Sequence, residues 1–250
     1  MFENIALFRV HCMRCILRAM SSDTLVLPND ARRLDNEPLS NQVYNVLRDA
    51  ICVGSIKAHD HLVQNQLAEQ LQVSRTPVRD ALLRLAQEGL VKAVSARGFV
   101  VEPLTPHDIL EVYELRRLLE VPVAAAAVPL LRAVDIAHLK DLNLEITTAP
   151  LDGWKAYDLN RQFHSRLIET SPNRLVRSTL SDLWDLPIAR RIFHQQVAKG
   201  FDAEEMAHGH VEIIAAVEAR DAEALTAALL VHLVEAREEA SKLIEMATSS

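Results

Sequence analysis

The sequence has few of the features that mark secreted or membrane proteins. Only three of its 250 residues are cysteines, at positions 12, 15 and 52, which excludes a disulfide framework and agrees with a reducing cytoplasm. The apolar stretch over residues 1–20 is interrupted by arginines too often to span a bilayer, and it has no convincing signal-peptide cleavage site. We therefore expect a cytoplasmic protein without a membrane segment. The Cys12-x-x-Cys15 pair stands alone, without a second pair at zinc-binding spacing, so we assign it no metal or redox role.

An excess of positive charge is also missing. The formal net charge is −7, which argues against a protein that coats nucleic acid along its whole surface. The charge is unevenly distributed, however. Residues 1–103 carry 12 Lys and Arg against 11 Asp and Glu, whereas residues 104–250 carry 15 against 23. A nearly neutral N-terminal part can still present a local basic surface, while the acidic C-terminal part is not expected to touch DNA.

The length allows two domains of ordinary size. Residues 1–37 read as an N-terminal extension, which we expect to be disordered, and Met20 is an alternative start within it. Residues 38–103 form the first predicted domain, and residues 104–247 form the second, with Pro103 and Pro106 at their junction.

The segment Ser74–Arg84 carries the strongest local signal. Ser74 is suited to cap a helix, and Pro77 falls in the first turn, where a missing N–H costs little. Val78, Leu82 and Leu85 recur at helical spacing and predict one buried stripe.

Three polar residues occupy another side of the same predicted helix. Arg75 and Arg79 lie one turn apart, with Thr76 beside them. Guanidinium groups near the start of a helix are well suited to reach guanine O6 and N7, or phosphate, in a major groove. An arginine-rich helix by itself is more often a solvated surface helix, so the neighbouring segments decide between the two interpretations.

Those segments predict a winged helix-turn-helix. Leu39–Gly54 and Leu67–Leu71 read as helices that precede the Ser74 helix, with Gln72 and Val73 as the turn. Downstream, Leu90–Val94 and Gly98–Glu102 read as two strands, which places Arg97 at the tip of the wing, in reach of a minor groove or a phosphate.

The combined pattern resembles the DNA-binding domain of GntR-family bacterial transcription regulators over about residues 38–103. The resemblance implies that Arg75, Thr76 and Arg79 contact DNA, with Arg84 as a possible phosphate contact and Arg97–Gly98 as the wing. Two positions depart from the family pattern. Gln72 stands where glycine is frequent, at an expected cost of about 1 kcal/mol if the turn needs a positive φ, and Asn65 stands where some members have arginine.

The C-terminal part reads as helices throughout, with no strand-like alternation. The expected helices cover residues 107–128, 133–147, 153–171, 173–197, 203–219 and 222–246. The predicted fold class is therefore mainly α, an N-terminal winged helix-turn-helix followed by an all-α bundle of six or seven helices.

Four residues of this bundle are candidates for a metal site. Asn160 and His164 lie one turn apart on one predicted helix, while His210 and His232 lie on two later ones. Three imidazoles and a carbonyl oxygen suit a divalent ion such as Zn²⁺ or Ni²⁺. On spacing alone, ordinary core or surface histidines are the more frequent outcome.

A second resemblance raises the weight of the metal hypothesis. The segments around Tyr113–Glu120, Asn160–His164, His210 and His232 resemble the C-terminal effector domain, called FCD, of the FadR-like subfamily. Many members bind a metal through an Asp and three histidines, and small carboxylate effectors sit against that metal. Asn160 replaces the Asp here, which implies weaker metal binding, and Asp158 is a poor substitute because it lies about 200° around the helix.

Arg116 has two possible roles. It could bind an effector carboxylate inside the bundle, or it could form a surface ion pair with Glu120 at i+4.

Together these features predict a regulator rather than an enzyme. We expect a homodimer that binds a palindromic double-stranded DNA operator, most simply as a repressor, and that responds to a small organic acid at a metal. Two alternatives remain open at this point. One is a metal-dependent hydrolase built on the three histidines, for which Glu169 and Glu212 are the nearest potential bases; the other is a metal-free regulator that senses an apolar or acyl ligand.

Overall fold

The computed structural model describes residues 37–95, 98–148, 153–198 and 203–248, and the predicted N-terminal extension lies almost entirely outside these ranges. The chain divides into two compact units, one ending at Pro103 and the other beginning at Leu104. Within the described residues, no helix is both long and apolar enough to cross a membrane.

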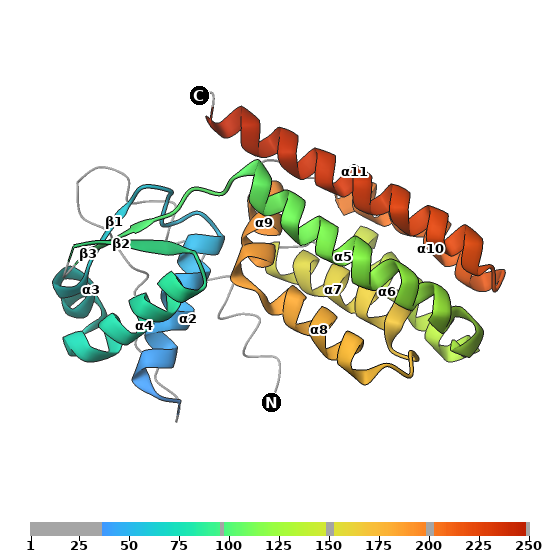
Figure 1. The fold of residues 1–250 in the computed structure, drawn as a ribbon, viewed down its shortest axis with the longest axis horizontal. Coiled ribbons are helices and arrows are strands. Elements are labelled where there is room, and N and C mark those ends of the chain that lie inside the picture. The colour runs from blue at the N-terminus through green and yellow to red at the C-terminus, as the bar shows by residue number, and fades with distance from the viewer. Residues whose placement is uncertain (1–36, 96–97, 149–152, 199–202, 249–250) are drawn as a thin grey trace. The chain divides into compact units, whose positions relative to one another are not determined.

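The first unit is a winged helix-turn-helix, as expected (Figure 1). Its elements in chain order are α2 (Leu39–Cys52), β1 (His61–Val63), α3 (Gln64–Leu71), α4 (Arg75–Gln87), β2 (Val91–Ser95) and β3 (Gly98–Val101). The three strands form an antiparallel sheet in the order β1-β3-β2. Strand β1 was not predicted, because three residues are too few to show a strand-like alternation.

The core of this unit lies between α2, α4 and the sheet. The predicted stripe on α4 is confirmed, since Val78, Leu82 and Leu85 are fully buried. Ser74 precedes α4 as expected, yet its side chain makes no capping hydrogen bond, so the predicted cap interaction is wrong. Pro77 is buried in the first turn and helps to define where α4 starts.

The turn between α3 and α4 requires a left-handed residue. Gln72 has φ 55° and ψ 41°, and the N–H of Val73 donates to the carbonyl of Ala68 at 3.0 Å. Gly89 closes α4 in the same manner, with φ 75° and a bond from the N–H of Leu90 to the carbonyl of Leu85 at 3.0 Å. The departure from glycine at position 72 therefore places a side chain in a conformation that favours glycine.

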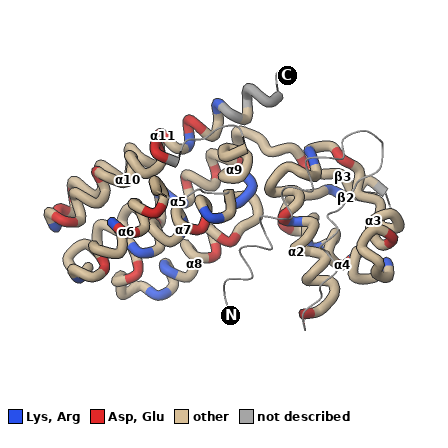
Figure 2. Tube along the Cα trace, turned by 180° about the vertical axis from the view of Figure 1, so that it is seen from behind, with Lys and Arg blue, Asp and Glu red and all other residues tan. Residues whose placement is uncertain are grey.

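The second unit is an all-α bundle (Figure 1). Its elements are α5 (Pro106–Ala127), the short 3-10 helix η1 (Val128–Leu130), α6 (Ala133–Thr148), α7 (Gly153–Ile168), α8 (Arg174–Asp185), α9 (Pro187–Ala198), α10 (Ala203–Glu218) and α11 (Ala222–Thr248). Helices α5 and α11 lie side by side over much of their length, and α7 packs against α5, α6 and α9. Acidic residues recur along α11 (Figure 2).

Local sequence explains where several of these helices begin and end. Thr105 caps α5 in a capping box with Asp108, in which each side chain accepts a hydrogen bond from the other residue's backbone N–H. Asp221 caps α11 by accepting from the N–H groups of Glu223 and Ala224 at 3.0 and 2.9 Å.

The single helix predicted over residues 173–197 is wrong. The structure has two helices, α8 and α9, which are separated at Leu186. Leu186 is extended, with φ −61° and ψ 131°, because the ring of Pro187 disfavours a helical conformation for the residue before it. The break gives α9 its own direction, and it allows Trp184 on α8 and Phe193 on α9 to approach the same side chain, Tyr157.

Candidate DNA-binding surface and histidine cluster

The side chains proposed to contact DNA lie on the exposed side of α4. Arg75, Thr76 and Arg79 are exposed, opposite the buried stripe that holds the helix in the core. Neither arginine makes an ion pair or a hydrogen bond within the described residues. Both guanidinium groups are therefore available to a ligand without breaking an existing interaction.

Arg84 differs from these two arginines. Its guanidinium carbon lies 3.6 Å from the centroid of the Tyr44 ring, and its Nε lies 3.2 Å from Oε1 of Glu88. The Tyr44 hydroxyl in turn donates to Oε2 of Glu88 at 2.6 Å. Burial and this neighbouring carboxylate raise the pKa of Tyr44 to about 12. Arg84 thus joins the C-terminal end of α4 to α2.

The wing is described only in part. Gly98 begins β3 and pairs with Ser95 across the hairpin, whereas Arg97 lies outside the described residues.

The structure brings three predicted histidines together inside the bundle. His164 on α7, His210 on α10 and His232 on α11 are buried, and each offers a ring nitrogen within 4.8 Å of the other two. We call this group the histidine cluster. Nε2 of His164 lies 3.3 Å from Nε2 of His232. Two nitrogens bound tetrahedrally to one Zn²⁺ at about 2.05 Å would be separated by about the same distance.

Hydrogen bonds orient two of the rings. Nδ1 of His164 bonds to Oε1 of Glu120 on α5, and Nδ1 of His210 lies 3.1 Å from Oδ1 of Asn143 on α6. The amide orientation of Asn143 is fixed because its Nδ2 donates to the carbonyl of Ala207 at 3.1 Å. Both imidazoles therefore carry their proton on Nδ1, so Nε2 is the nitrogen that each ring could offer to a metal.

His232 is oriented by close packing instead. A β-carbon on Gly209 would lie 2.7 Å from Nδ1 of His232 and 3.5 Å from its Cε1. The first of these distances is shorter than a β-carbon can tolerate, so the ring occupies space that only a glycine leaves open.

The electrostatics of the cluster favour neutral imidazoles. Burial lowers the pKa of His164, and it lowers the pKa values of His210 and His232 further still, with the neighbouring rings and Arg116 contributing. Burial alone would raise the pKa of Glu120, but His164 and Arg116 beside it bring the value to about 2. Neutral imidazoles next to an ionised carboxylate are the protonation states that divalent metal binding requires.

Two buried polar atoms near the cluster have no hydrogen-bond partner. They are Nε2 of His210 and Oδ1 of Asn160. Asn160 lies one turn before His164 on α7 and is only 6% exposed. Because unpartnered buried polar atoms are rare, these two lone pairs fit the chemistry of a cation-binding site. Asp158 is exposed and bonds to Gln162, so it is not a ligand candidate.

Arg116 is not part of a surface ion pair, so that interpretation is wrong. Arg116 and Glu120 are 5% and 1% exposed, and Nε of Arg116 lies 3.1 Å from Oε2 of Glu120. The helical spacing was read correctly, but the sequence could not show that this side of α5 faces the bundle interior. Nη2 of Arg116 is buried and has no partner.

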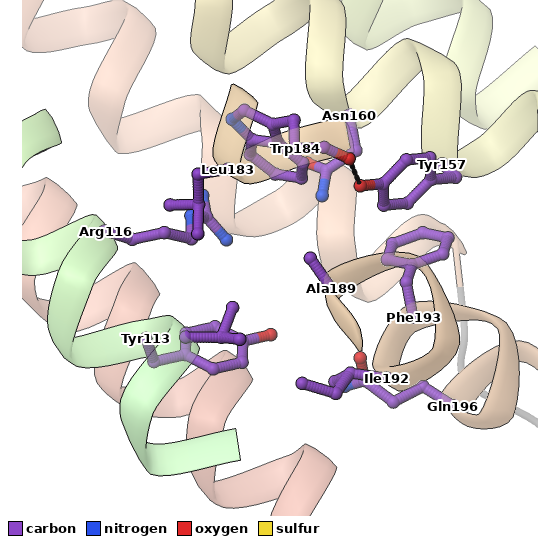
Figure 3. Close-up of a pocket in the computed structure, with 11 residues that line it drawn as sticks. Tyr113, Arg116, Tyr157, Asn160, Leu183, Trp184, Ala189, Ile192, Phe193 and Gln196 are labelled. Atoms are coloured by element: carbon purple, nitrogen blue, oxygen red, sulfur yellow. Dashed lines mark hydrogen bonds between the residues drawn. The ribbon is translucent and has the colours of Figure 1, made fainter. Parts of the chain in front are cut away.

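A cavity of about 30 Å³ lies between α5, α7, α8 and α9 (Figure 3). This volume is enough for about two water molecules. Arg116, Tyr113 and Val112 line it from α5, and Asn160 and Tyr157 from α7. The remaining lining residues come from α8 and α9, and they are Leu183, Trp184, Ala189, Ile192, Phe193 and Gln196.

Trp184 connects this cavity to the cluster. Its ring stacks on His164 at a centroid distance of 5.5 Å, and the guanidinium carbon of Arg116 lies 4.4 Å from its centroid. Figure 3 shows Arg116 and Trp184 facing the same space. Sequence reasoning missed Trp184 and Gln196, because neither stands in a recognisable motif.

Two further histidines of this unit, and the two carboxylates considered as hydrolytic bases, lie outside the histidine cluster. His208 is exposed, while His194 is buried against Trp154 and does not join the cluster. Glu169 and Glu212, considered as hydrolytic bases, are both exposed. Glu120 is close to His164, but its two oxygens already bond to His164 and Arg116.

Both units match known families. Residues 39–101 match the family described as bacterial regulatory proteins, gntR family, and residues 111–235 match the FCD domain. The chain is 30% identical to the uncharacterized HTH-type transcriptional regulator YdhC of Bacillus subtilis over 204 residues, which cover 78% of this chain and 88% of that protein. It is also 30% identical to the HTH-type transcriptional regulator McbR of Escherichia coli over 61% of this chain and 70% of McbR.

Solved structures agree with this assignment. The structure of E. coli McbR/YncC has a TM-score of 0.60 at 28% identity and covers 80% of this chain and 95% of its own. A putative GntR regulator from Rhodococcus has a TM-score of 0.62 at 26% identity, with coverage of 80% and 96%. The chain therefore belongs to the gntR family of bacterial regulatory proteins, has an FCD domain, and is a DNA-binding transcriptional regulator rather than an enzyme.

Proposed function

We propose that this regulator changes its operator affinity when a small carboxylate binds beside a divalent metal in the FCD domain. His164, His210 and His232 would hold the metal, with Asn160 as a fourth ligand. The observation that carries the proposal is the convergence of three buried histidines within 4.8 Å, two of them oriented by bonds at Nδ1. A bound Zn²⁺ or Ni²⁺ would supply a Lewis acid for a carboxylate oxygen.

The cavity supports a small anionic effector. Arg116 presents an unpartnered, buried Nη2, and guanidinium groups bind carboxylates strongly when they are shielded from water. The buried charge of Arg116 opposes an apolar ligand such as an acyl chain. We therefore favour a compact organic acid over the apolar ligand of the alternative hypothesis.

In the first unit, Arg75, Thr76 and Arg79 would enter the major groove, with Gly98 and the wing beside the DNA backbone. The exposure of these α4 side chains supports this assignment. A homodimer would bind the two halves of a palindromic operator, and effector binding would relieve repression by favouring a state with lower DNA affinity.

Metal analysis tests the proposal directly. Purified wild-type protein should contain about one divalent ion per chain, and His164→Ala should lose it. His208→Ala is the matched control, because His208 is exposed near the cluster on the same helix as His210. A thermal-shift screen with small organic acids would then identify an effector for operator-binding assays. A metal-free protein that responds fully to that effector would show that the metal part of the proposal is wrong.

A further inference from the structure

Glu120 bonds both to a residue that lines the cavity and to a residue of the histidine cluster. Its Oε2 lies 3.1 Å from Nε of Arg116, which lines the cavity, and its Oε1 bonds to Nδ1 of His164 in the histidine cluster. The carboxylate is 1% exposed, so water does not screen either interaction. Each carboxylate oxygen of Glu120 therefore bonds to one of the two sites, and the two sites share its single negative charge.

We propose that Glu120 is a positioning residue that couples the two sites: a carboxylate bound at Arg116 strengthens metal binding by the histidine cluster, and metal binding strengthens carboxylate binding in return. This inference rests on the function proposed above. It adds a specific residue, a direction and a reciprocal dependence between the two ligands.

The direction of the coupling follows from the chain of charged and polar groups that joins the two sites. This chain runs from the bound carboxylate through Arg116 and Glu120 to the Nδ1 proton of His164. A carboxylate at Nη2 of Arg116 partly neutralises the guanidinium, which then attracts Glu120 less. More of the Glu120 charge is left to accept the Nδ1 proton of His164, and a more strongly polarised imidazole is a better ligand at Nε2. Because linkage is reciprocal, a metal at the cluster must favour the carboxylate by the same factor.

The other contacts that Arg116 makes are compatible with coupling through Glu120. Within the described residues, Glu120 is its single ion-pair partner, and its Nη2 has no partner. The aromatic rings of Trp184 and Tyr113 lie at 4.4 and 5.6 Å from its guanidinium carbon. These rings hold the guanidinium beside the cavity, so a bound carboxylate must act on the same group that Glu120 contacts.

The coupling can be measured as a change in Zn²⁺ affinity on addition of acetate, the simplest carboxylate probe. Zn²⁺ would be titrated against a competing chromogenic chelator, with chloride at equal ionic strength as the reference. For wild-type protein, saturating acetate should tighten Zn²⁺ binding by roughly 5- to 150-fold. Glu120→Gln keeps the size of the side chain but removes its charge, so it should still bind Zn²⁺ while losing most of the acetate effect.

Two further variants complete the test. Arg116→Met should also abolish the acetate effect, and it carries the test if Glu120→Gln does not fold by circular dichroism. Asp158→Asn is the matched control, since it removes an exposed carboxylate from α7 and should leave the effect intact. Acetate binding itself would be followed by the fluorescence of Trp184 in a Trp154→Phe background, because the chain has two tryptophans.

The possible outcomes are distinct. An acetate effect of undiminished size in Glu120→Gln would overturn the proposal, because direct contact between carboxylate and metal would then account for the whole effect. Unchanged Zn²⁺ affinity in wild-type protein, despite a fluorescence response to acetate, would overturn the coupling while leaving the proposed function in place. Wild-type protein that binds no Zn²⁺ would overturn both, and it is recognised before acetate is added.

Discussion

Gly209 and His232 pack so closely that any side chain at position 209 would displace the imidazole. A β-carbon there would lie 2.7 Å from Nδ1 of His232. Gly209 is a helical residue next to His210, where glycine is normally unfavourable by about 1 kcal/mol relative to alanine. Glycine at position 209 thus lowers the stability of α10, but it leaves room for the His232 ring in the histidine cluster.

Gly209→Ala should therefore weaken metal binding by roughly 10- to 100-fold, the range found when groups that orient metal ligands are altered. The measurement is Zn²⁺ titration against a chelator, with circular dichroism to verify folding. Gly153→Ala is the matched control, because its β-carbon would lie 2.9 Å from Nδ1 of His194, which is not in the cluster. Equal Zn²⁺ affinities for the wild-type and Gly209→Ala proteins would show that His232 is not held by this contact.

Gln72→Gly should stabilise the first unit. Gln72 has φ 55°, a conformation that costs a residue with a β-carbon about 1 kcal/mol, and glycine adopts it freely. Part of the gain is offset by the greater freedom of glycine in the unfolded chain, so we expect about 0.5 kcal/mol net. Urea unfolding followed by circular dichroism measures the change.

Gln66→Gly provides the comparison for that prediction, since Gln66 is exposed within α3. There the same replacement should destabilise by about 1 kcal/mol. Destabilisation of similar size by both replacements would show that the left-handed turn is not a source of strain.

Arg79→Ala should abolish sequence-specific operator binding while leaving metal content unchanged. Loss of a bidentate base contact costs about 1–3 kcal/mol, or roughly 5- to 150-fold in affinity, at each half-site of the operator. Gel-shift titration with duplexes selected from a randomised pool gives the measurement. Arg174→Ala removes an exposed arginine from the second unit and should bind normally. If Arg79→Ala kept its sequence preference, the proposed recognition surface would be wrong.

Arg84→Ala should act mainly on stability. Its guanidinium stacks on Tyr44 and pairs with Glu88, and loss of an exposed cation–π contact costs about 0.5–1 kcal/mol. The salt dependence of operator binding should stay close to that of the wild type, whereas a lost phosphate contact would reduce the slope by about 1. A reduced slope would restore Arg84 as a phosphate contact.

The metal-free protein should lose stability as the pH falls below about 6.5. Burial holds the pKa values of His210 and His232 well below their ordinary value, so the unfolded chain takes up protons there before the folded chain does. For each histidine that stays neutral in the folded protein, the free energy of unfolding then falls by about 1.4 kcal/mol for each unit of decrease in pH. Urea unfolding in the presence of a chelator from about pH 7.5 to 5.5 measures this slope. His210→Asn should make it shallower, and a flat profile for the wild type would contradict neutral buried imidazoles.

Local sequence was sufficient for most of the architecture. The winged helix-turn-helix was predicted because α4 has an apolar stripe at helical spacing, with Ser74 and Pro77 at its start. Most helices of the second unit were predicted for the same reason, and the helix expected over residues 107–128 corresponds to α5. The break at Pro187 was missed because the apolar pattern continues through it, although the proline itself was visible.

The candidate metal ligands could be named from the sequence only because a family resemblance selected three histidines out of ten. Spacing along the chain does not say which sides of α7, α10 and α11 face one another. Tertiary packing decided that Glu120 points both to His164 and to Arg116, and that Trp184 lies between the cavity and the cluster. Periodicity is a property of a single helix, so it is encoded locally. Convergence depends on how helices distant in sequence pack, and the three-dimensional fold alone determines it.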